Sequence, residues 1–280
     1  MVRIIRFIFT LCLLIIVCSI SQARDIEVYF TPDEKAAYII GQYIDQAKKS
    51  IDVAMYCFTS RKLAWKIVCA KERGVKIRVL MDAHQGDVLE NKYTKSLFLK
   101  KRGVDVRLAE PCVYKDFEGI MHNKFSIIDR KIVITGSLNW TASAYTRNNE
   151  NIVILKRVDV ANLYEQNFEK LWKKSQPLKF NVESLEVINA EDIEEILANT
   201  GRYVRIRGII SEVYISPSHT CFLHFRNNIQ LKIVIFKNTQ MPYNPLILQG
   251  KEVEIWGRIS NTEKYGLEII VDLPEQIKIL

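Results

Sequence analysis

The sequence predicts an α/β module with a mainly parallel sheet at its centre, followed by a small all-β barrel. Helix-like and strand-like runs alternate from residue 26 to about 175, whereas the chain beyond residue 203 is nearly all strand-like. The length of 280 residues suits about two domains. Apolar residues make up 48% and charged residues 26%. These ordinary values exclude a disordered chain, a collagen-like repeat and a multi-span membrane protein.

The first 23 residues have the pattern of a secretory signal peptide. Arg3 and Arg6 precede a continuous apolar run over residues 7–20, and small residues at Ser21 and Ala23 suit cleavage after Ala23. The apolar run is shorter than the roughly 20 residues of a full membrane span. We therefore expect a secreted or periplasmic protein. An uncleaved signal would instead tether the chain to a membrane, facing outside the cytoplasm.

In the α/β module, recognisable start and stop residues separate the expected elements. Pro32 favours a helix start within residues 31–34, and glycines at 74 and 103 end two later helices. The alternation predicts helices that cover the faces of a mostly parallel sheet. The expected strands are residues 26–30, 51–58, 75–81 and 104–108, and the expected helices are residues 31–49, 61–73 and 91–102.

Further along, the pattern predicts a hairpin and then a second module. The expected elements are strands 124–128 and 131–135 joined at Asp129-Arg130, strand 151–156, helix 158–174, an acidic helix at 190–198, and strands 203–213, 220–225, 231–236, 251–259 and 267–272. Five late strands predict a Greek-key barrel. The run from Tyr203 to Ile210, with Gly208 inside it, resembles the glycine-bent first strand of an OB-fold. A boundary near residues 175–177 gives a signal peptide (1–23), a first domain (24–178) and a second domain (181–280).

The excess of positive over negative charge lies entirely in the first module. Residues 24–180 contain 28 Lys and Arg against 19 Asp and Glu, whereas residues from 181 onward contain 10 against 13. A net charge of +9 on one module points to a polyanionic partner, either nucleic acid or an anionic membrane surface. A basic surface that only contacts solvent is the alternative.

Cleavage of the signal would leave four cysteines, at positions 57, 69, 112 and 221. An oxidising compartment permits one or two disulfides, and four buried free thiols are the alternative. No Cys or His cluster has the spacing of a zinc site. We therefore expect no metal and no cofactor.

The segment with the clearest chemistry begins at His122. His122 and Lys124 alternate on an expected strand, and Ser137 and Asn139 alternate on the segment that the hairpin brings back. An imidazole, an ammonium, a hydroxyl and an amide can thus converge. This set suits a phosphate diester, because the cation and the amide bind phosphoryl oxygens while the imidazole attacks phosphorus or moves a proton.

The pattern His122-x-Lys124-x4-Asp129, followed by Gly136-Ser137-x-Asn139, resembles the HKD motif of the phospholipase D superfamily. The resemblance covers residues 26–174 and implies an α/β/α sandwich with a mixed sheet. Glu150 matches the acidic residue that follows the motif. The motif occurs once, and family members of this size pair two chains so that each supplies one motif to a shared site. The resemblance is greatest to the small secreted bacterial endonucleases, from which the barrel is a departure.

This resemblance implies a role for each residue of the motif. His122 of one subunit forms a phosphohistidine, and the same histidine of the second subunit protonates the leaving oxygen and then activates water. Lys124, Ser137 and Asn139 hold the phosphoryl oxygens, and Glu150 orients a histidine. Five residues separate Asp129 from Lys124, so we expect Asp129 to form a structural ion pair.

On the barrel, aromatic and cationic side chains share strand faces. The candidate nucleic-acid-binding residues are Arg205, Arg207, Phe222, His224 and Arg226, with Tyr203 beside them. An ordinary exposed strand face is the alternative. A barrel that packs on a catalytic dimer or recruits a protein partner is a second one.

These observations favour a metal-independent endonuclease that acts as a homodimer on nucleic acid, DNA in preference to RNA. The first alternative is a phospholipase D or phosphatidyl transferase that acts on phospholipids with the same chemistry. The second alternative is a non-catalytic nucleic-acid-binding protein on the same fold.

Overall fold

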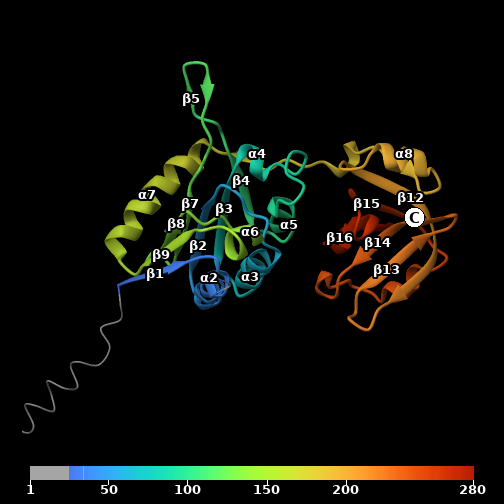
Figure 1. Cartoon of the computed structure of the whole chain (residues 1–280), viewed down its shortest axis with the longest axis horizontal. Coiled ribbons are helices and arrows are strands. Elements are labelled where there is room, and N and C mark those ends of the chain that lie inside the picture. The colour runs from blue at the N-terminus through green and yellow to red at the C-terminus, as the bar shows by residue number, and fades with distance from the viewer. Residues whose placement is uncertain (1–24, 34) are drawn as a thin grey trace, which may run out of the picture.

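The computed structural model describes residues 25–33 and 35–280 (Figure 1). The expected signal peptide, residues 1–23, lies outside the described residues. Within the described part of the chain, no helix is long and apolar enough to cross a membrane. Figure 1 shows two bodies side by side, a layered α/β module and a β-rich module that ends at the C-terminus.

The first module is built on an eight-stranded mixed sheet, in the order β1-β9-β8-β7-β2-β3-β4-β10. Its strands are β1 (Ile26–Phe30), β2 (Ser50–Met55), β3 (Lys76–Asp82), β4 (Asp105–Ala109), β7 (Lys124–Ile128), β8 (Ile132–Gly136), β9 (Asn151–Leu155) and β10 (Gln176–Pro177). The pairs β2–β3 and β3–β4 are parallel, and the others are antiparallel. The parallel centre that the sequence predicts is thus present, with antiparallel strands on both sides of it.

Helices cover both faces of this sheet, as the predicted α/β/α sandwich requires. They are α2 (Lys35–Gln46), α3 (Arg61–Glu72), α4 (Ala83–Gly86), α5 (Ser96–Lys101), α6 (Ala142–Thr146) and α7 (Val158–Lys174). Val53 of β2 packs in the core cluster that contains the buried residues of α2 and α3. Its neighbour Ala54 packs in a second cluster with Phe168 and Trp172 of α7. Successive residues of a strand point to opposite faces, so the two clusters lie on the two sides of the sheet.

Three expected helices begin later than the sequence predicts, at Lys35 where 31 was expected, at Ser96 where 91 was expected and at Ile193 where 190 was expected. Helix α2 begins at Lys35, whose N–H is bonded to the Asp33 carboxylate at 2.8 Å. Residues 87–95 form turns because Asp87 accepts the N–H of Leu89 and Asn91 accepts the N–H of Tyr93. Such side-chain bonds compete with the helix. The hairpin β5 (Val113–Tyr114) and β6 (Phe117–Glu118), which protrudes in Figure 1, was not predicted.

The second module contains a closed five-stranded barrel, in the order β12-β13-β14-β16-β15 and back to β12. Only the pair β14–β16 is parallel, which is the strand arrangement of an OB-fold. The module consists of β11 (Val187–Asn189), α8 (Ile193–Ala198), β12 (Tyr203–Ile215), β13 (Cys221–Phe225), β14 (Asn228–Ile235), β15 (Glu252–Thr262), β16 (Gly266–Val271) and β17 (Ile277–Ile279), with 3-10 turns at Val182–Ser184, Lys237–Thr239, Pro245–Leu248 and Pro274–Gln276.

Strand β12 closes the barrel because it bends near Gly208. Residues 203–209 pair with β15, and residues from 210 to 215 pair with β13. A Cβ atom at Gly208 would lie 2.6 Å from the Cβ of Ala190 and 3.0 Å from the Phe225 ring. Glycine therefore fits this crowded bend where any side chain would clash.

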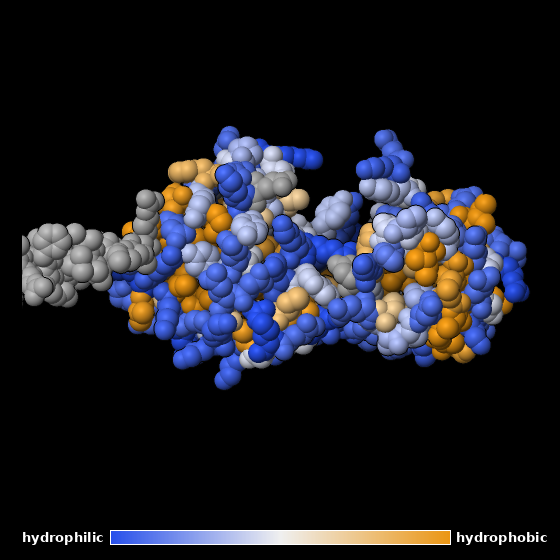
Figure 2. All heavy atoms as spheres, turned by 90° about the horizontal axis from the view of Figure 1, so that it is seen from below, coloured by the Kyte–Doolittle hydropathy of each residue, from blue (hydrophilic) through white to orange (hydrophobic). Residues whose placement is uncertain are grey.

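The two modules pack against each other. Trp256 and Leu273 of the second module belong to the core cluster of the first, and Phe180 contacts the rings of Tyr203 and Trp256. Residues 176–177, where the sequence suggests a boundary, form β10 and pair with β4. On the face in Figure 2, hydrophobic residues gather in a band on the barrel, while hydrophilic residues dominate the waist between the modules.

All four described cysteines, at positions 57, 69, 112 and 221, are free thiols. Cys221 is buried in the barrel, and burial raises the pKa of its thiol to about 11. The structure thus has the free thiols of the second alternative, but of the four described cysteines Cys57 and Cys69 are half-buried and Cys112 is exposed.

Candidate active site

The motif residues lie where β7 begins and β8 ends. Lys124 is the first residue of β7, and His122 precedes the strand with an exposed side chain. Ser137 and Asn139 follow the last residue of β8. Because β7 and β8 pair antiparallel, with Phe125 opposite Thr135, the two short segments lie side by side at one edge of the sheet. His122 is therefore placed by a loop, not by the strand alternation that the sequence suggested.

Neighbouring groups hold the His122 loop in place. The ring of Tyr56 meets the imidazole edge to face, with 4.7 Å between centroids. The backbone N–H of Tyr56 donates to the carbonyl of Asn123 at 2.9 Å. On the other side of His122, the N–H of Met121 donates to the buried Asp82 carboxylate at 3.0 Å. Sequence reasoning missed both Tyr56 and Asp82 as residues that position His122. An acid at the end of a buried strand, such as Asp82, is a signal that could have indicated this role.

Lys124 is a partly desolvated cation beside His122. Its Nζ donates to the backbone carbonyl of His122 at 2.9 Å and lies 5.2 Å from the centroid of the Tyr56 ring. Burial lowers the pKa of Lys124, and the nearby charge of Glu150 opposes part of that shift. Among the described residues no carboxylate forms an ion pair with this ammonium, so it can bind an anion.

Ser137 and Glu150 form a connected pair. The Ser137 hydroxyl donates to the Glu150 carboxylate at 2.5 Å and accepts the backbone N–H of Asn151 at 3.1 Å. Asn148 donates to the other carboxylate oxygen at 3.2 Å, and the Thr31 hydroxyl accepts the N–H of Glu150 at 3.0 Å. Thr31 was not predicted as a site residue. In the described part of the chain no hydrogen bond joins Glu150 to His122.

The amide oxygen of Asn139 is buried, and no described residue gives it a hydrogen bond. The loop around it is fixed, because the N–H of Trp140 donates to the Cys57 carbonyl at 3.2 Å. An unsatisfied buried amide is costly unless a bound group supplies the missing partner. Since the oxygen and nitrogen of an amide are interchangeable by a flip, Asn139 can present either an acceptor or a donor to a ligand.

Within the part of the chain that the structure describes, Asp129 does not form the ion pair that the sequence predicts. Its carboxylate accepts the backbone N–H groups of Lys48, Lys49 and Ser50, at 2.6 to 3.1 Å, where α2 leads into β2. These bonds hold the pKa of Asp129 below its usual value, although burial opposes them. Asp129 lies at the end of β7 remote from Lys124, so it fixes a turn and does not line the site.

We expect Asp129→Ala to lower the free energy of unfolding by about 1–2 kcal/mol, because the half-buried N–H of Ser50 and the exposed N–H groups of Lys48 and Lys49 lose a charged acceptor. The lowered pKa means that this stabilisation is complete above about pH 4 and disappears as pH falls through the folded-state pKa. Urea unfolding of wild type and variant at pH 7 and pH 3 measures it. Equal stabilities at pH 7 would contradict this role, and Asp129→Asn, which keeps an acceptor, is the matched control.

The arginines of the predicted nucleic-acid-binding face are already paired within the protein. Arg205 lies 3.4 Å from Glu254 and 3.3 Å from Glu183, and its side chain is only 15% exposed. Arg207 lies 2.8 Å from Glu254. The sequence pattern did not weigh Glu183, in the 3-10 turn Val182–Ser184, or Glu254 on β15, and these two carboxylates neutralise both cations.

The other members of that predicted face belong to a different part of the barrel. Phe222 stacks on Tyr214, with 6.1 Å between centroids, and His224 pairs in register with Glu212. Arg226 is exposed beyond the end of β13. These residues adjoin the half of β12 that pairs with β13, whereas Arg205 and Arg207 adjoin the half that pairs with β15. The five residues therefore do not form one cationic face.

Among the described residues, no three His, Cys, Asp or Glu side chains gather as a candidate metal site. The predicted phosphate ligand Ser137 already donates its one proton to Glu150, whereas the Lys124 ammonium and the Asn139 amide have bonding capacity left. Lys124 and Asn139 can bind the oxygens of a phosphate group next to the imidazole of His122.

Known proteins resemble the first module. Residues 40–172 match the family described as "Cardiolipin synthase, PLD-like domain". The chain is 36% identical over 152 residues to a phospholipase D of Rickettsia conorii, which covers 54% of this chain and 71% of that protein. It is 33% identical over 135 residues to the mitochondrial cardiolipin hydrolase of Mus musculus, covering 48% of this chain and 57% of that protein.

Among solved structures, NucT from Helicobacter pylori matches with a TM-score of 0.52 and 26% identity, covering 55% of this chain and 98% of that chain. The chain spans only 49–60% of the length of the mitochondrial cardiolipin hydrolases that it matches. The matched family region ends at residue 172, before the barrel begins. These matches agree with the motif at His122 and with the mixed sheet that presents it. The chain therefore belongs to the phospholipase D superfamily.

Proposed function

We propose that the protein is a phosphodiesterase that hydrolyses nucleic acid internally, through a phosphohistidine intermediate in a homodimeric active site. An imidazole nitrogen of His122 attacks phosphorus, and the bond from phosphorus to the leaving oxygen breaks. His122 of the second copy gives its proton to that oxygen. Water then attacks the phosphohistidine, the second imidazole accepts the water proton, and the first histidine is released.

The chain's own groups support this chemistry. Lys124 and Asn139 offset and bind the developing negative charge on the phosphoryl oxygens. Glu150 fixes Ser137 within the same chain. Any histidine that Glu150 orients would therefore come from the second copy, which fits the family arrangement that the motif implies.

The main observation in favour of nucleic acid as the substrate is the OB-type barrel that packs on the basic catalytic module. OB-folds bind oligonucleotides and oligosaccharides, and residues 24–180 have a net charge of +9. An oligosaccharide would not explain the positive charge, whereas a polyphosphate strand accounts for both features. DNA is the expected strand, and the expected location is outside the cytoplasm.

Phospholipid hydrolysis is the second candidate, because two kinds of relative carry names that refer to phospholipase D and cardiolipin hydrolase. The decisive experiment incubates the purified protein with supercoiled plasmid DNA and, separately, with cardiolipin-containing vesicles, both in excess EDTA. We expect nicked and fragmented DNA and intact lipid. Lipid hydrolysis with intact plasmid would favour the second candidate, and activity that requires added Mg²⁺ would contradict the metal-free mechanism.

We predict that the active species is a homodimer, because one chain supplies one motif histidine and the two-step mechanism uses two. A two-fold interface places the same patch from each chain face to face. Sedimentation velocity at assay concentration should show a dimer, and activity per chain should fall on dilution below the dissociation constant. A fully active monomer would contradict the shared site.

A further inference from the structure

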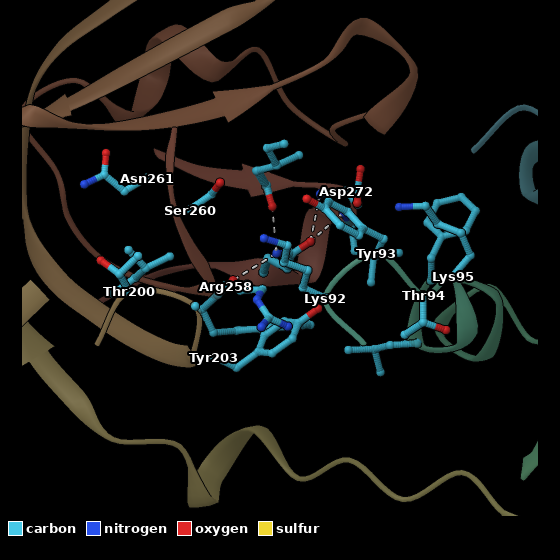
Figure 3. A pocket seen from close by; sticks show the side chains of 18 of the residues that line it. Lys92, Tyr93, Thr94, Lys95, Thr200, Tyr203, Arg258, Ser260, Asn261 and Asp272 are labelled. Atoms are coloured by element: carbon cyan, nitrogen blue, oxygen red, sulfur yellow. Dashed lines mark hydrogen bonds between the residues drawn. The ribbon is translucent and has the colours of Figure 1, made fainter. Parts of the chain in front are cut away.

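A cavity of about 240 Å³ lies between the two modules, away from the catalytic motif (Figure 3). The turn at residues 92–95 forms one wall, and β12, β15 and β16 of the second module form the others. Figure 3 shows the labelled side chains converging from both modules. The volume is slightly below the roughly 300–1,000 Å³ of typical ligand clefts, so it suits one small group.

The walls of this cavity carry more positive than negative charge. Lys92, Lys95 and Arg258 line it, together with a single carboxylate, Asp272. Asp272 is paired with Arg61 at 2.9 Å. Among the described residues, the ammonium of Lys95 has no hydrogen bond or ion pair. The charge of Asp272 also acts on Lys95, but Asp272 is shared with Arg61, so the cavity has more cationic groups than its one carboxylate balances.

Two of these cations are half-buried. Burial lowers the pKa of Lys95 and that of Arg258. The Nε of Arg258 is buried without a partner in the described structure, while its terminal nitrogen donates to the Val88 carbonyl at 3.3 Å. Buried charge without a partner is costly, and an anion in the cavity would remove that cost.

Aromatic rings accompany the cations. Tyr93, Tyr203 and Trp256 line the cavity, and Tyr93 is 61% exposed. The guanidinium of Arg258 lies 6.0 Å from the centroid of the Tyr203 ring. A cationic groove with aromatic platforms is the arrangement that binds a nucleotide, because the cation contacts the phosphate and the ring stacks on the base.

The cavity wall is tied to the catalytic segment. The backbone N–H of Lys95 donates to the Phe58 carbonyl at 3.0 Å, and the Asn91 amide contacts the sulfur of Cys57 at 3.9 Å. Phe58 lies two residues after Tyr56, whose ring contacts His122. Two residues of extended chain span at most about 7 Å. One nucleic-acid strand is long enough to occupy both places.

We propose that this cavity binds one nucleotide unit of the substrate strand, its phosphate on Lys95 and Arg258 and its base against Tyr93. The inference rests on the proposed nuclease function and adds a binding site outside the catalytic motif. It also gives the barrel a role, because residues of β12, β15 and β16 complete the cavity.

The test measures binding without cleavage. Fluorescein-labelled 12-residue oligothymidylate is titrated, by anisotropy, into His122→Ala protein that also carries Lys95→Gln, Tyr93→Ala or the control Lys173→Gln on the exposed surface of α7. We expect Tyr93→Ala to weaken binding about 5- to 150-fold. We expect Lys95→Gln to weaken it and to reduce the slope of log K against log salt by about 0.7, the value for one lost phosphate contact on a single strand. Lys173→Gln should change the slope less.

A second arm uses thymidine 5′-monophosphate and inorganic phosphate, with the fluorescence of the tryptophans as the readout. We expect the nucleotide to bind more tightly than phosphate, and both to weaken with Lys95→Gln. If plasmid is cleaved but Lys95→Gln and Tyr93→Ala bind the oligonucleotide like wild type, the cavity inference is wrong and the nuclease function stands. If the nucleotide binds and Lys95→Gln abolishes it while plasmid stays intact, the cavity is a nucleotide site and the nuclease proposal is wrong.

Discussion

His122→Ala should reduce hydrolysis to less than about 0.1% of the wild-type rate while the fold persists. General acid–base catalysis alone contributes about 10²–10⁴-fold, and the substitution also removes the nucleophile. Because the imidazole is exposed and its flanking backbone is held by Tyr56 and Asp82, its loss should leave the free energy of unfolding nearly unchanged. Initial rates on plasmid and a urea unfolding curve measure the two effects separately.

His84→Ala is the matched control for this experiment. His84 is exposed, and its ring nitrogen contacts Glu90 at 2.5 Å, which raises the pKa of the imidazole. It lies outside the catalytic set, so its removal should leave the rate within a factor of about two of wild type. Retention of more than a few per cent of kcat in His122→Ala would overturn the nucleophile assignment.

Lys124→Met should lower kcat about 10²- to 10³-fold, the usual cost of removing one group that stabilises transition-state charge. The methionine keeps the length and packing of the side chain against Tyr56 but removes the positive charge. KM should change much less than kcat, because the charge on the phosphoryl oxygens grows in the transition state. Lys124→Arg keeps the charge and should recover part of the rate.

The pH profile gives this lysine a separate signature. Burial lowers the pKa of Lys124 below 10.5, so its positive charge is lost at a lower pH than for an ordinary lysine. The alkaline fall in kcat/KM, which reports the free enzyme, should therefore begin below pH 10.5 in wild type and move upward in Lys124→Arg. An alkaline limb that is identical in the two proteins would show that another group titrates there.

Local patterns were sufficient to predict most elements of both modules. The alternation of apolar residues predicted the barrel strands. The spacing of residues from His122 to Asn139 identified the motif. The contacts that position the motif could not be predicted, because they join distant parts of the chain. Tyr56 and Asp82 lie 66 and 40 residues from His122, and nothing in their own neighbourhoods identifies that partner.

The barrel face was predicted less well than the motif, for a related reason. Strand alternation correctly indicates that Arg205 and Arg207 point outward, but it does not reveal which residues lie opposite. Glu254 of β15 is 47 residues from Arg207 and pairs with both arginines. The sequence predicts a helix over residues 91–102, whereas residues 91–95 belong to a turn, and the cavity that this turn lines depends on it.

The packing of Trp256 and Leu273 into the core of the first module has a consequence for cooperativity. If the barrel opened alone, it would remove these two apolar side chains from the shared core and leave the surface around Phe180 in contact with water. Unfolding either module alone therefore also removes contacts that stabilise the other module. Heating should melt the two halves in a single calorimetric transition, even though each has its own sheet.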